Sequence, residues 1–306
     1  MRKSLITAVF AALLPIAASA SVFDQGAVET RDFRNPTLAR EALAQGVETE
    51  SLFGFVLGSD VDPAGSRGIA LETVMALGRR SGAYRAAGSK LEVSYGVTDS
   101  VSVSLGLLGG WRGIRDVPGM SNANSLRFDG VGTELRWRLL DREEAPVGVT
   151  LHIEPSLRWR DETTGDRGQG IAAENKLIID QALMPGRLYA AMNLIYDVER
   201  FRTAGGAAGS SSSAGLGGAL TYQVSKGLFL GIETRYLRAY EGLTFGRYRG
   251  EAVFAGPSLF WSPSHGFWVS AAADAQLAGR EAGSAAALDL ADFSRIQARL
   301  KIGMEF

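Results

Sequence analysis

Residues 295–306 end the chain and read Arg-Ile-Gln-Ala-Arg-Leu-Lys-Ile-Gly-Met-Glu-Phe, so a polar residue or glycine alternates with an apolar residue throughout. Alternation with a period of two places the two sets of side chains on opposite faces of a β-strand. Leu300 and Phe306 would share the apolar face, and Arg299 and Lys301 the polar one. A strand of a soluble sandwich turns its apolar face to a core, whereas a strand of a membrane barrel turns it to lipid. The period alone fits both folds.

Similar strands recur along the chain from residue 68 onward. We predict strands at about residues 69–80, 88–96, 101–111, 128–140, 147–161, 171–182, 187–200, 214–224, 228–240, 251–261, 266–277 and 294–306. Their connectors alternate between short turns such as Ser225–Gly227 and longer stretches rich in small residues such as Thr203–Ser213. Short turns at one end and long loops at the other are typical of outer-membrane barrels, and a sandwich has no reason to sort its loops in this way. We therefore predict a transmembrane antiparallel up-and-down β-barrel of about twelve strands over residues 68–306.

Aromatic residues gather near the predicted strand ends, as expected at the two interfaces of a membrane. The short-turn ends carry Trp137, Trp261, Phe267, Trp268 and Phe306, and the long-loop ends carry Trp111, Trp159, Phe201 and Tyr240.

Some stretches fit this pattern less well. Pro155 and Pro257 fall inside predicted strands, where proline cannot donate to the ladder, so each should mark a bulge or a misplaced boundary. Gly205–Gly215 and Gly279–Ala287 are rich in small residues and are predicted to be flexible extracellular loops.

The first twenty residues indicate export. Arg2 and Lys3 precede an apolar run from Ile6 to Ala18, and Ala18-Ser-Ala20 offers the small side chains that a signal peptidase accepts. The run is too short to cross a bilayer of about 30 Å comfortably, so we predict a cleaved signal peptide over residues 1–20. The following segment, residues 21–67, holds an apolar patch and ends in turn residues. It is predicted to be a periplasmic lead-in or a small plug, with a loosely ordered tail as the alternative.

The composition narrows the functional classes. The chain has no cysteine and two histidines, which argues against a zinc or iron–sulfur site, so we predict no metal and no cofactor. Loss of Arg2 and Lys3 with the signal leaves 30 basic and 33 acidic residues, a balance that does not favour nucleic acid as a partner. The sequence contains no phosphate-loop or dinucleotide-binding pattern.

The chain shows two resemblances to known proteins, one in its final strand and one in a pair of glycine-containing motifs. The final strand, ending in Phe306, resembles the C-terminal signal that the barrel-assembly machinery of Gram-negative bacteria reads. Gly54-Phe-Val-Leu-Gly-Ser-Asp60 and Tyr95-Gly-Val-Thr-Asp99 resemble motifs of porin-like outer-membrane proteins of uncharacterised function. The resemblance implies a barrel in the outer membrane, with lipid and the assembly machinery as partners and passive transport as its activity. It brings no catalytic residues.

Charged residues of both signs occupy the predicted inner face of the barrel. They are Glu72, Glu92, Glu134, Arg136, Arg138, His152, Glu154, Arg158, Arg160, Glu174, Lys176, Asp180, Asp197, Glu199, Glu233, Arg235, Asp274, Arg299 and Lys301. In a water-filled lumen these residues would line a pore for small solutes. If they instead paired across a narrow lumen, they would fill it and leave a closed structural or adhesive barrel. We predict passive passage of small solutes, with the closed barrel as the alternative.

A hydrolase is a weaker alternative. His152 would be its base, but the predicted strand turns this side chain toward the lumen, away from lipid substrates. His265 falls in a short turn, and the chain has no Gly-x-Ser-x-Gly motif to supply a nucleophile. The sequence therefore predicts no catalytic residues and no enzymatic activity.

Overall fold

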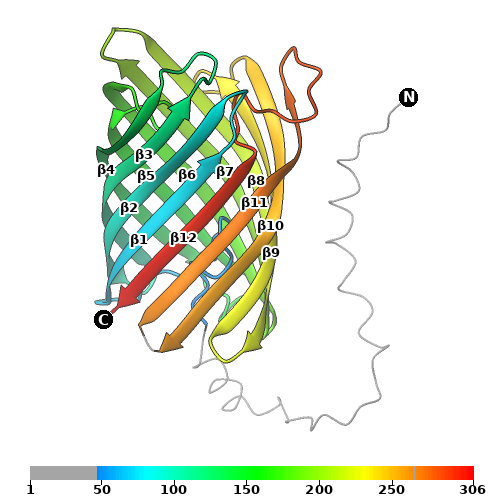
Figure 1. The fold of residues 1–306 in the computed structure, drawn as a ribbon. Helices are drawn as coiled ribbons and strands as arrows, with labels where there is room; N and C mark the ends of the chain where they lie inside the picture. The colour runs from blue at the N-terminus through cyan, green and yellow to red at the C-terminus, as the bar shows by residue number, and fades with distance from the viewer. Residues whose placement is uncertain (1–46, 265) are drawn as a thin grey trace, which may run out of the picture. The chain divides into compact units, whose positions relative to one another are not determined.

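Twelve strands make up the regular structure of the computed structural model, which describes residues 47–264 and 266–306 (Figure 1). The strands are β1 Arg67–Leu77, β2 Ala83–Thr98, β3 Val101–Arg115, β4 Ala123–Leu140, β5 Gly148–Arg160, β6 Arg167–Met184, β7 Leu188–Thr203, β8 Ala208–Ser225, β9 Leu228–Glu241, β10 Tyr248–Ser264, β11 Phe267–Glu281 and β12 Ile296–Glu305. The predicted signal peptide, the first part of the predicted lead-in and His265 lie outside the described residues.

The strands form one closed antiparallel sheet. Each strand pairs with its neighbours in sequence, and β12 pairs with β1 to complete the ring. The closing register runs from Gly68 opposite Glu305 to Leu77 opposite Ile296. The predicted transmembrane up-and-down barrel is confirmed, together with its strand number. No helix in the described part of the chain is long and apolar enough to cross a membrane.

The wall of the barrel has an apolar outside and a polar inside. On β12, Leu300 is 43% exposed and Met304 50%, whereas Arg299 is 7% exposed and Lys301 5%. A soluble sandwich would show the reverse, because its apolar side chains would be the buried ones. The exposed apolar belt instead suits the hydrocarbon interior of a membrane.

Several strands extend further toward the long-loop end than the sequence suggested. The small-residue run Gly205–Gly215 was predicted to be a loop, but β8 begins at Ala208 and includes most of it. In the same way, β11 continues to Glu281 and takes in the start of the second predicted loop. Ladder hydrogen bonds need only the backbone, so a strand of Gly and Ser can pair although its side chains show little alternation. The longest connector at this end is 282–295.

Both prolines lie within strands, and neither marks a bulge. On β5, Ser156 opposite Gly132 and Ile153 opposite Leu135 keep one register across Pro155, and only the positions between them are unpaired with β4. On β10 the register with β11 is likewise unchanged on either side of Pro257. A residue in an antiparallel strand directs its N–H and C=O toward the same neighbour, so each proline interrupts one ladder locally and leaves the other intact.

Two aromatic residues of the predicted interface belts turn inward instead. Trp268 packs beside the lumen, where its indole nitrogen donates to Glu305 Oε1 at 3.1 Å. Phe201 of β7 is buried beside Gly168 and Gly170 of the neighbouring strand β6. Trp137, Trp159 and Trp261 remain exposed on the outer face, as predicted for belt residues.

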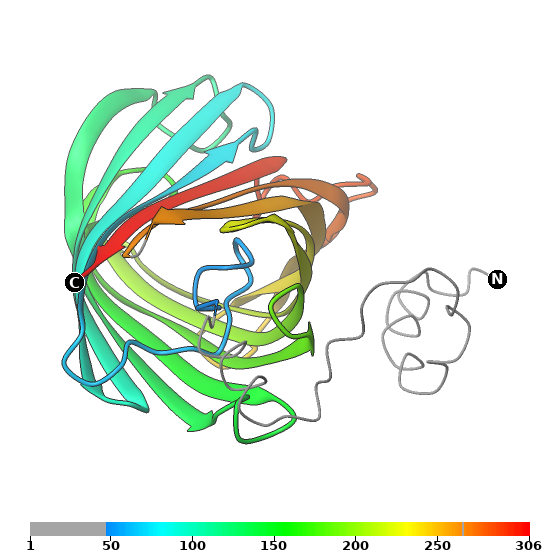
Figure 2. The same cartoon turned by 90° about the horizontal axis from the view of Figure 1, so that it is seen from below.

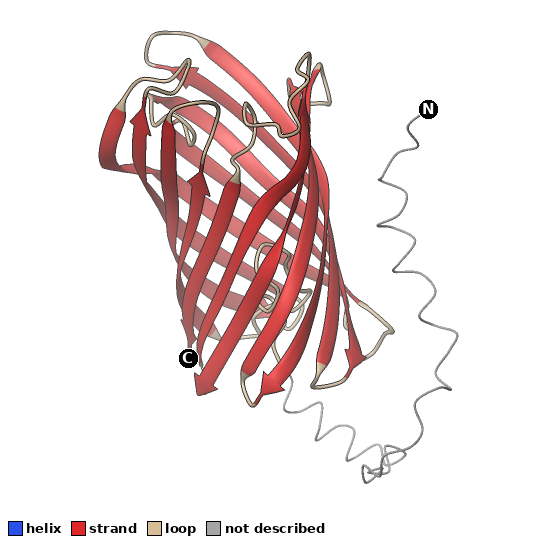
Figure 3. Cartoon of the chain, turned by 45° about the vertical axis from the view of Figure 1, so that its right-hand side comes forward, coloured by secondary structure: helices blue, strands red, loops and turns tan. Residues whose placement is uncertain are grey.

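Residues 47–62, which precede β1, lie inside the barrel, within the ring of strands that Figure 2 shows from the short-turn end. It has no regular secondary structure and occupies the half of the lumen near the short turns (Figure 3). Leu52, Phe53 and Val56 are fully buried there against Tyr189 and Phe229 on the wall. We refer to residues 47–62 as the plug.

Candidate functional site: a charged lumen with an internal plug

Asp180 on β6 is the most heavily used plug anchor. Its carboxylate accepts hydrogen bonds from the Ser59 amide at 2.9 Å, the Ser59 hydroxyl at 2.6 Å and the Thr49 hydroxyl at 2.6 Å. Arg142, in the turn after β4, adds a fourth contact at 3.1 Å and reaches Asp60 at 2.5 Å. Burial alone would lower the pKa of Arg142, but the charges of Asp60 and Asp180 raise it above its ordinary value. This group of side chains thus ties both ends of the plug to the barrel.

Basic and hydroxyl side chains of the wall satisfy the plug's carbonyl groups. Arg136 on β4 donates to the carbonyl of Gly58 at 2.6 Å and to that of Asp60 at 2.9 Å. Thr150 on β5 donates to the Ser59 carbonyl, and Arg299 on β12 donates to the carbonyl of Gly54. Buried carbonyl groups without partners would be costly, so these donors compensate for the plug's lack of secondary structure.

Acceptors on the opposite wall satisfy the plug's amide groups. The amides of Phe55 and Val56 donate to the two oxygens of Glu233 at 3.2 and 3.1 Å. Asn193 pairs with Leu57 in both directions, accepting from its amide at 2.8 Å and donating to its carbonyl at 2.9 Å. Arg235 also stacks on the Phe55 ring, with its Cζ 3.8 Å from the ring centre.

The plug accounts for the first of the two quoted motifs, and a turn beside it accounts for the second. Gly54 has a φ of +101°, and a Cβ there would come within 2.7 Å of Ala272 Cβ. Gly96 exchanges backbone hydrogen bonds with the plug's exit at Gly65 and Ser66, and a Cβ on it would overlap the carbonyl of Pro63. The Gly54–Asp60 motif is therefore the central part of the plug, and the Tyr95–Asp99 motif holds the segment that leaves it.

A cavity of about 280 Å³ lies beyond the plug, toward the long-loop end. Members of the predicted inner-face set line much of it: Glu72, Glu134, Arg136, His152, Glu154, Arg158, Glu174, Lys176, Asp197, Arg235, Arg299 and Lys301. The others lie nearby on the wall. Glu92 pairs with Lys90 and Lys301, Asp274 pairs with Arg235, Arg138 reaches Asp141, and Arg160 donates to a loop carbonyl at Gly165. Glu199 is only partly buried.

Sequence reasoning missed several residues of this site. Lys90 on β2 is the centre of an ion cluster, within 2.8–3.2 Å of Glu92, Glu134 and Glu154. Arg112 and Asp129 form a buried pair at 2.6 Å on the cavity wall. Lys90 lies inside the predicted strand 88–96, two positions before Glu92 and on the same face, so the alternation does place it inward. Arg112 lies just beyond the predicted end of its strand, because β3 continues to Arg115. Asp129 lies at a register shift between β3 and β4, which interrupts the alternation there.

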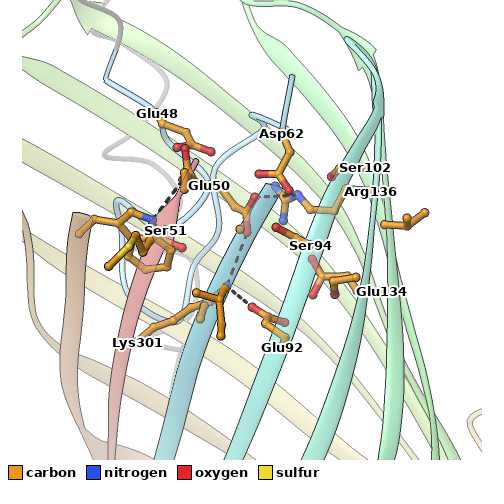
Figure 4. Close-up of a pocket in the computed structure, with 18 of the residues that line it drawn as sticks. Glu48, Glu50, Ser51, Asp62, Glu92, Ser94, Ser102, Glu134, Arg136 and Lys301 are labelled. Carbon is orange, nitrogen blue, oxygen red and sulfur yellow. Dashed lines mark hydrogen bonds and ion pairs between the residues drawn. The ribbon is translucent and has the colours of Figure 1, made fainter. Parts of the chain in front are cut away.

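At the short-turn end a small pocket separates the plug from the wall (Figure 4). Carboxylate oxygens of Glu48, Asp62 and Glu305 come within 4.8 Å of one another there. Burial raises the pKa of Glu48 well above its usual value, and repulsion from Glu305 and then Glu50 adds to the shift. Burial also raises the pKa of Asp62, although a hydrogen bond from Ser94 opposes the shift. Acidic side chains are therefore crowded at this end of the plug, where Arg136 and Lys301 are each 3.6 Å from Glu50.

The connector 282–295 folds back over the other end. Asp289 is buried and caps the amides of Ala291 and Asp292 at 3.1 and 3.0 Å. Phe293 packs on Phe254 of β10, with ring centres 6.2 Å apart. The connector thus covers part of the lumen's long-loop opening.

These features define a class of protein: a transmembrane β-barrel of the outer-membrane type, with a polar lumen and an internal plug. The chain belongs to a family of unknown function, DUF6662, whose model matches residues 45–306. The match takes in the plug and the whole barrel. No curated protein matches the sequence.

Several solved structures are similar to this chain at low identity. The β-domain of the Bordetella autotransporter BrkA is 12% identical with a TM-score of 0.51, covering 79% of this chain and all of the other. The translocator domain of the autotransporter NalP from Neisseria meningitidis is 13% identical with a TM-score of 0.48, covering 89% and 96%. The NanC porin is 11% identical with a TM-score of 0.45, covering 78% and 98%. At such identities the likeness concerns the fold alone.

Proposed function

We propose that this protein is an outer-membrane channel for passive passage of small polar solutes, and that its plug closes the periplasmic half of the lumen until it moves. The cavity of about 280 Å³ carries the proposal, because charges of both signs line it and, among the described residues, the plug closes its side toward the short-turn end. A wall of mixed charge favours hydrated polar solutes over apolar ones. In this proposal the signal peptide directs export, and the strand ending in Phe306 is read by the barrel-assembly machinery.

The closed structural barrel is the second candidate, and the plug's anchoring favours it. Asp180, Glu233 and Asn193 each hold plug atoms by two or more hydrogen bonds. If such a plug never leaves its place, the lumen does not conduct. The two candidates therefore differ in one physical property, the mobility of residues 47–62.

A disulfide that locks the plug separates the two candidates, since the chain has no cysteine of its own. A Cβ added at Gly217 on β8 would stand 3.0 Å from Val56 Cγ2, so cysteines at both positions fall within reach of a disulfide, whose Cβ atoms are about 3.5–4.5 Å apart. We expect Val56→Cys/Gly217→Cys to lose planar-bilayer conductance when oxidised and to regain it with reductant. A matched control is Thr73→Cys/Ser89→Cys, which joins two strands outside the lumen.

The control pair should conduct equally in both redox states. Absence of conductance from the wild-type protein and from the reduced lock variant, at any voltage, would refute the channel and leave the closed barrel. Conductance that persists through an oxidised lock would refute the plug as the gate.

A further inference from the structure

His152 is a buried polar side chain whose position the proposed channel does not explain. It lies on the inner face of β5, is 1% exposed, and neither of its ring nitrogens has a hydrogen-bond partner in the described structure. An imidazole so placed would be expected to have at least one partner, because burying an unpaired polar group is costly. The ring lines the cavity of about 280 Å³, so there is space beside it for a small ligand.

Two carboxylates face the imidazole at distances that are too long for hydrogen bonds. Nδ1 is 3.6 Å from Glu134 Oε1, and Nε2 is 3.8 Å from Glu154 Oε2. Hydrogen bonds of this type measure about 2.7–3.2 Å. A metal ion can bind only one of the two ring nitrogens, so these two distances are not the spacing of ligands on a single ion. They show that each nitrogen faces a carboxylate oxygen without being hydrogen-bonded to it.

The three side chains lie close enough together that they could hold one metal ion. One ligand atom from each of Glu134, His152 and Glu154 lies within 4.8 Å of the other two. Glu134 and His152 occupy diagonal positions on paired strands, since His152 is opposite Arg136, and Glu154 follows His152 on the same face. The β4–β5 ladder is unpaired beside them, at Pro155. Three protein ligands and an adjoining cavity leave a coordination position open to solvent.

Lys90 contacts one oxygen of Glu134 and one of Glu154, and in each carboxylate it is not the oxygen that faces the imidazole. Its ammonium group contacts Glu134 Oε2 at 3.2 Å and Glu154 Oε1 at 2.9 Å, on the other side of each carboxylate. It also contacts Glu92 at 2.8 Å, so three carboxylates share this one ammonium group. The oxygens that face His152 are therefore not the ones that the ammonium group contacts.

We propose that Glu134, His152 and Glu154 bind one divalent transition-metal ion, with Zn²⁺ as the test ion, inside the lumen. Imidazole nitrogen and carboxylate oxygen are ligands that Zn²⁺ accepts, and an ion with only oxygen preference would not use the histidine. This metal site does not depend on whether the barrel conducts, since it needs only the folded wall of β4 and β5. The composition suggested no metal because it offers no cysteine and few histidines, but a site of one histidine and two glutamates is assembled by strand pairing and has no sequence motif.

The test is a Zn²⁺ titration of the refolded, tag-free barrel at pH 7 by calorimetry. All variants carry His265→Gln, which removes the chain's other histidine. We expect one Zn²⁺ per chain in this background and at least tenfold weaker binding after His152→Gln. Glu199→Gln, which removes a carboxylate two strands away on β7, should change the affinity less than twofold. Zinc-edge X-ray absorption should show a single imidazole ligand.

The substitution Lys90→Met should change the Zn²⁺ affinity in the opposite direction. Removing the ammonium group should strengthen Zn²⁺ binding several-fold, because the metal no longer competes with a fixed positive charge for the same carboxylates. Heat-modifiable migration on gels establishes that each variant is folded before titration. Absence of binding up to millimolar Zn²⁺, equal binding by His152→Gln, or weaker binding by Lys90→Met would each overturn the assignment.

Discussion

Replacing Asp180 with asparagine should undock the plug without opening the barrel. The Asp180 carboxylate is 2% exposed and accepts hydrogen bonds from Ser59, Thr49 and Arg142. An asparagine retains the shape but loses the charge, and it presents an NH₂ group to one of these donors. Arg142 is then left with Asp60 as its carboxylate partner.

The size of the effect follows from the burial of the group. Removing one partner of a buried, hydrogen-bonded charge network costs about 3–5 kcal/mol. These contacts join the plug to the wall, so most of this cost should fall on docking. At about 1.4 kcal/mol for each factor of ten, the undocked population should rise by roughly 10² to 10³ or more, up to the limit set by the total docking free energy.

Hydrogen exchange at the Leu57 amide measures this population. The Leu57 amide donates to Asn193 on β7 and not to Asp180 on β6, so faster exchange there reports undocking of the plug as a unit. Asp129→Asn is the matched control, because Asp129 is equally buried but pairs with Arg112 on the barrel wall. Equal exchange at Leu57 in both variants, or no change in Asp180→Asn, would show that the plug is not held as a cooperative unit through Asp180.

Three further outcomes follow from the same structure. Burial raises the pKa of Glu48 and Asp62, so these two groups bind protons more tightly in the docked plug than in the undocked one. Docking should therefore be strongest at acidic pH, below their ordinary pKa values. It should weaken as the pH rises through the raised values. Exchange of the plug amides at pH 5 and pH 8, corrected for intrinsic rates, checks this, and Glu48→Gln should tighten docking at pH 8 and flatten the dependence. Leu300→Arg puts a charge on the apolar outer face and should destabilise the barrel in vesicles by about 2–4 kcal/mol if it lies near the midplane, as urea unfolding would show. Deleting Phe306, which is 74% exposed, should lower the amount of barrel assembled in cells while refolding of the purified chain stays normal; equal loss in both assays would mean that the residue acts on stability instead of recognition.

The barrel could be predicted because each strand shows its two faces in its own sequence. In β12 every outward residue is apolar and every inward one is polar or glycine, and such a pattern needs no knowledge of distant residues. Where side chains are small, as in Gly209 and the serines that follow it, the same backbone pairing occurs with no pattern to show it. The strand ends were therefore less accurately predicted than the strands.

The plug contacts could not be predicted in this way. Ser59 and Asp180 are 121 positions apart, and Gly54 and Arg299 are 245 apart. These pairs meet only because the barrel closes around a segment that has no periodic pattern of its own. The ligand cluster at His152 depends in the same way on the register between β4 and β5, which no local motif records.

The charges on the inner face are evidence for a plug as much as for a pore. An irregular segment inside a barrel brings backbone amides and carbonyls that neither water nor a ladder satisfies, and the wall must supply their partners. Arg136, Glu233 and Arg299 do so, although a sequence pattern cannot distinguish them from pore-lining charges. What distinguishes them is the partner: a charge bonded to plug backbone holds the lumen closed, whereas a charge paired along the wall, such as Lys90 with Glu154, would stay in place when the plug moves. Both kinds occur in this lumen, so the charge of the inner face cannot by itself tell a pore from a plugged barrel, and only movement of the plug can.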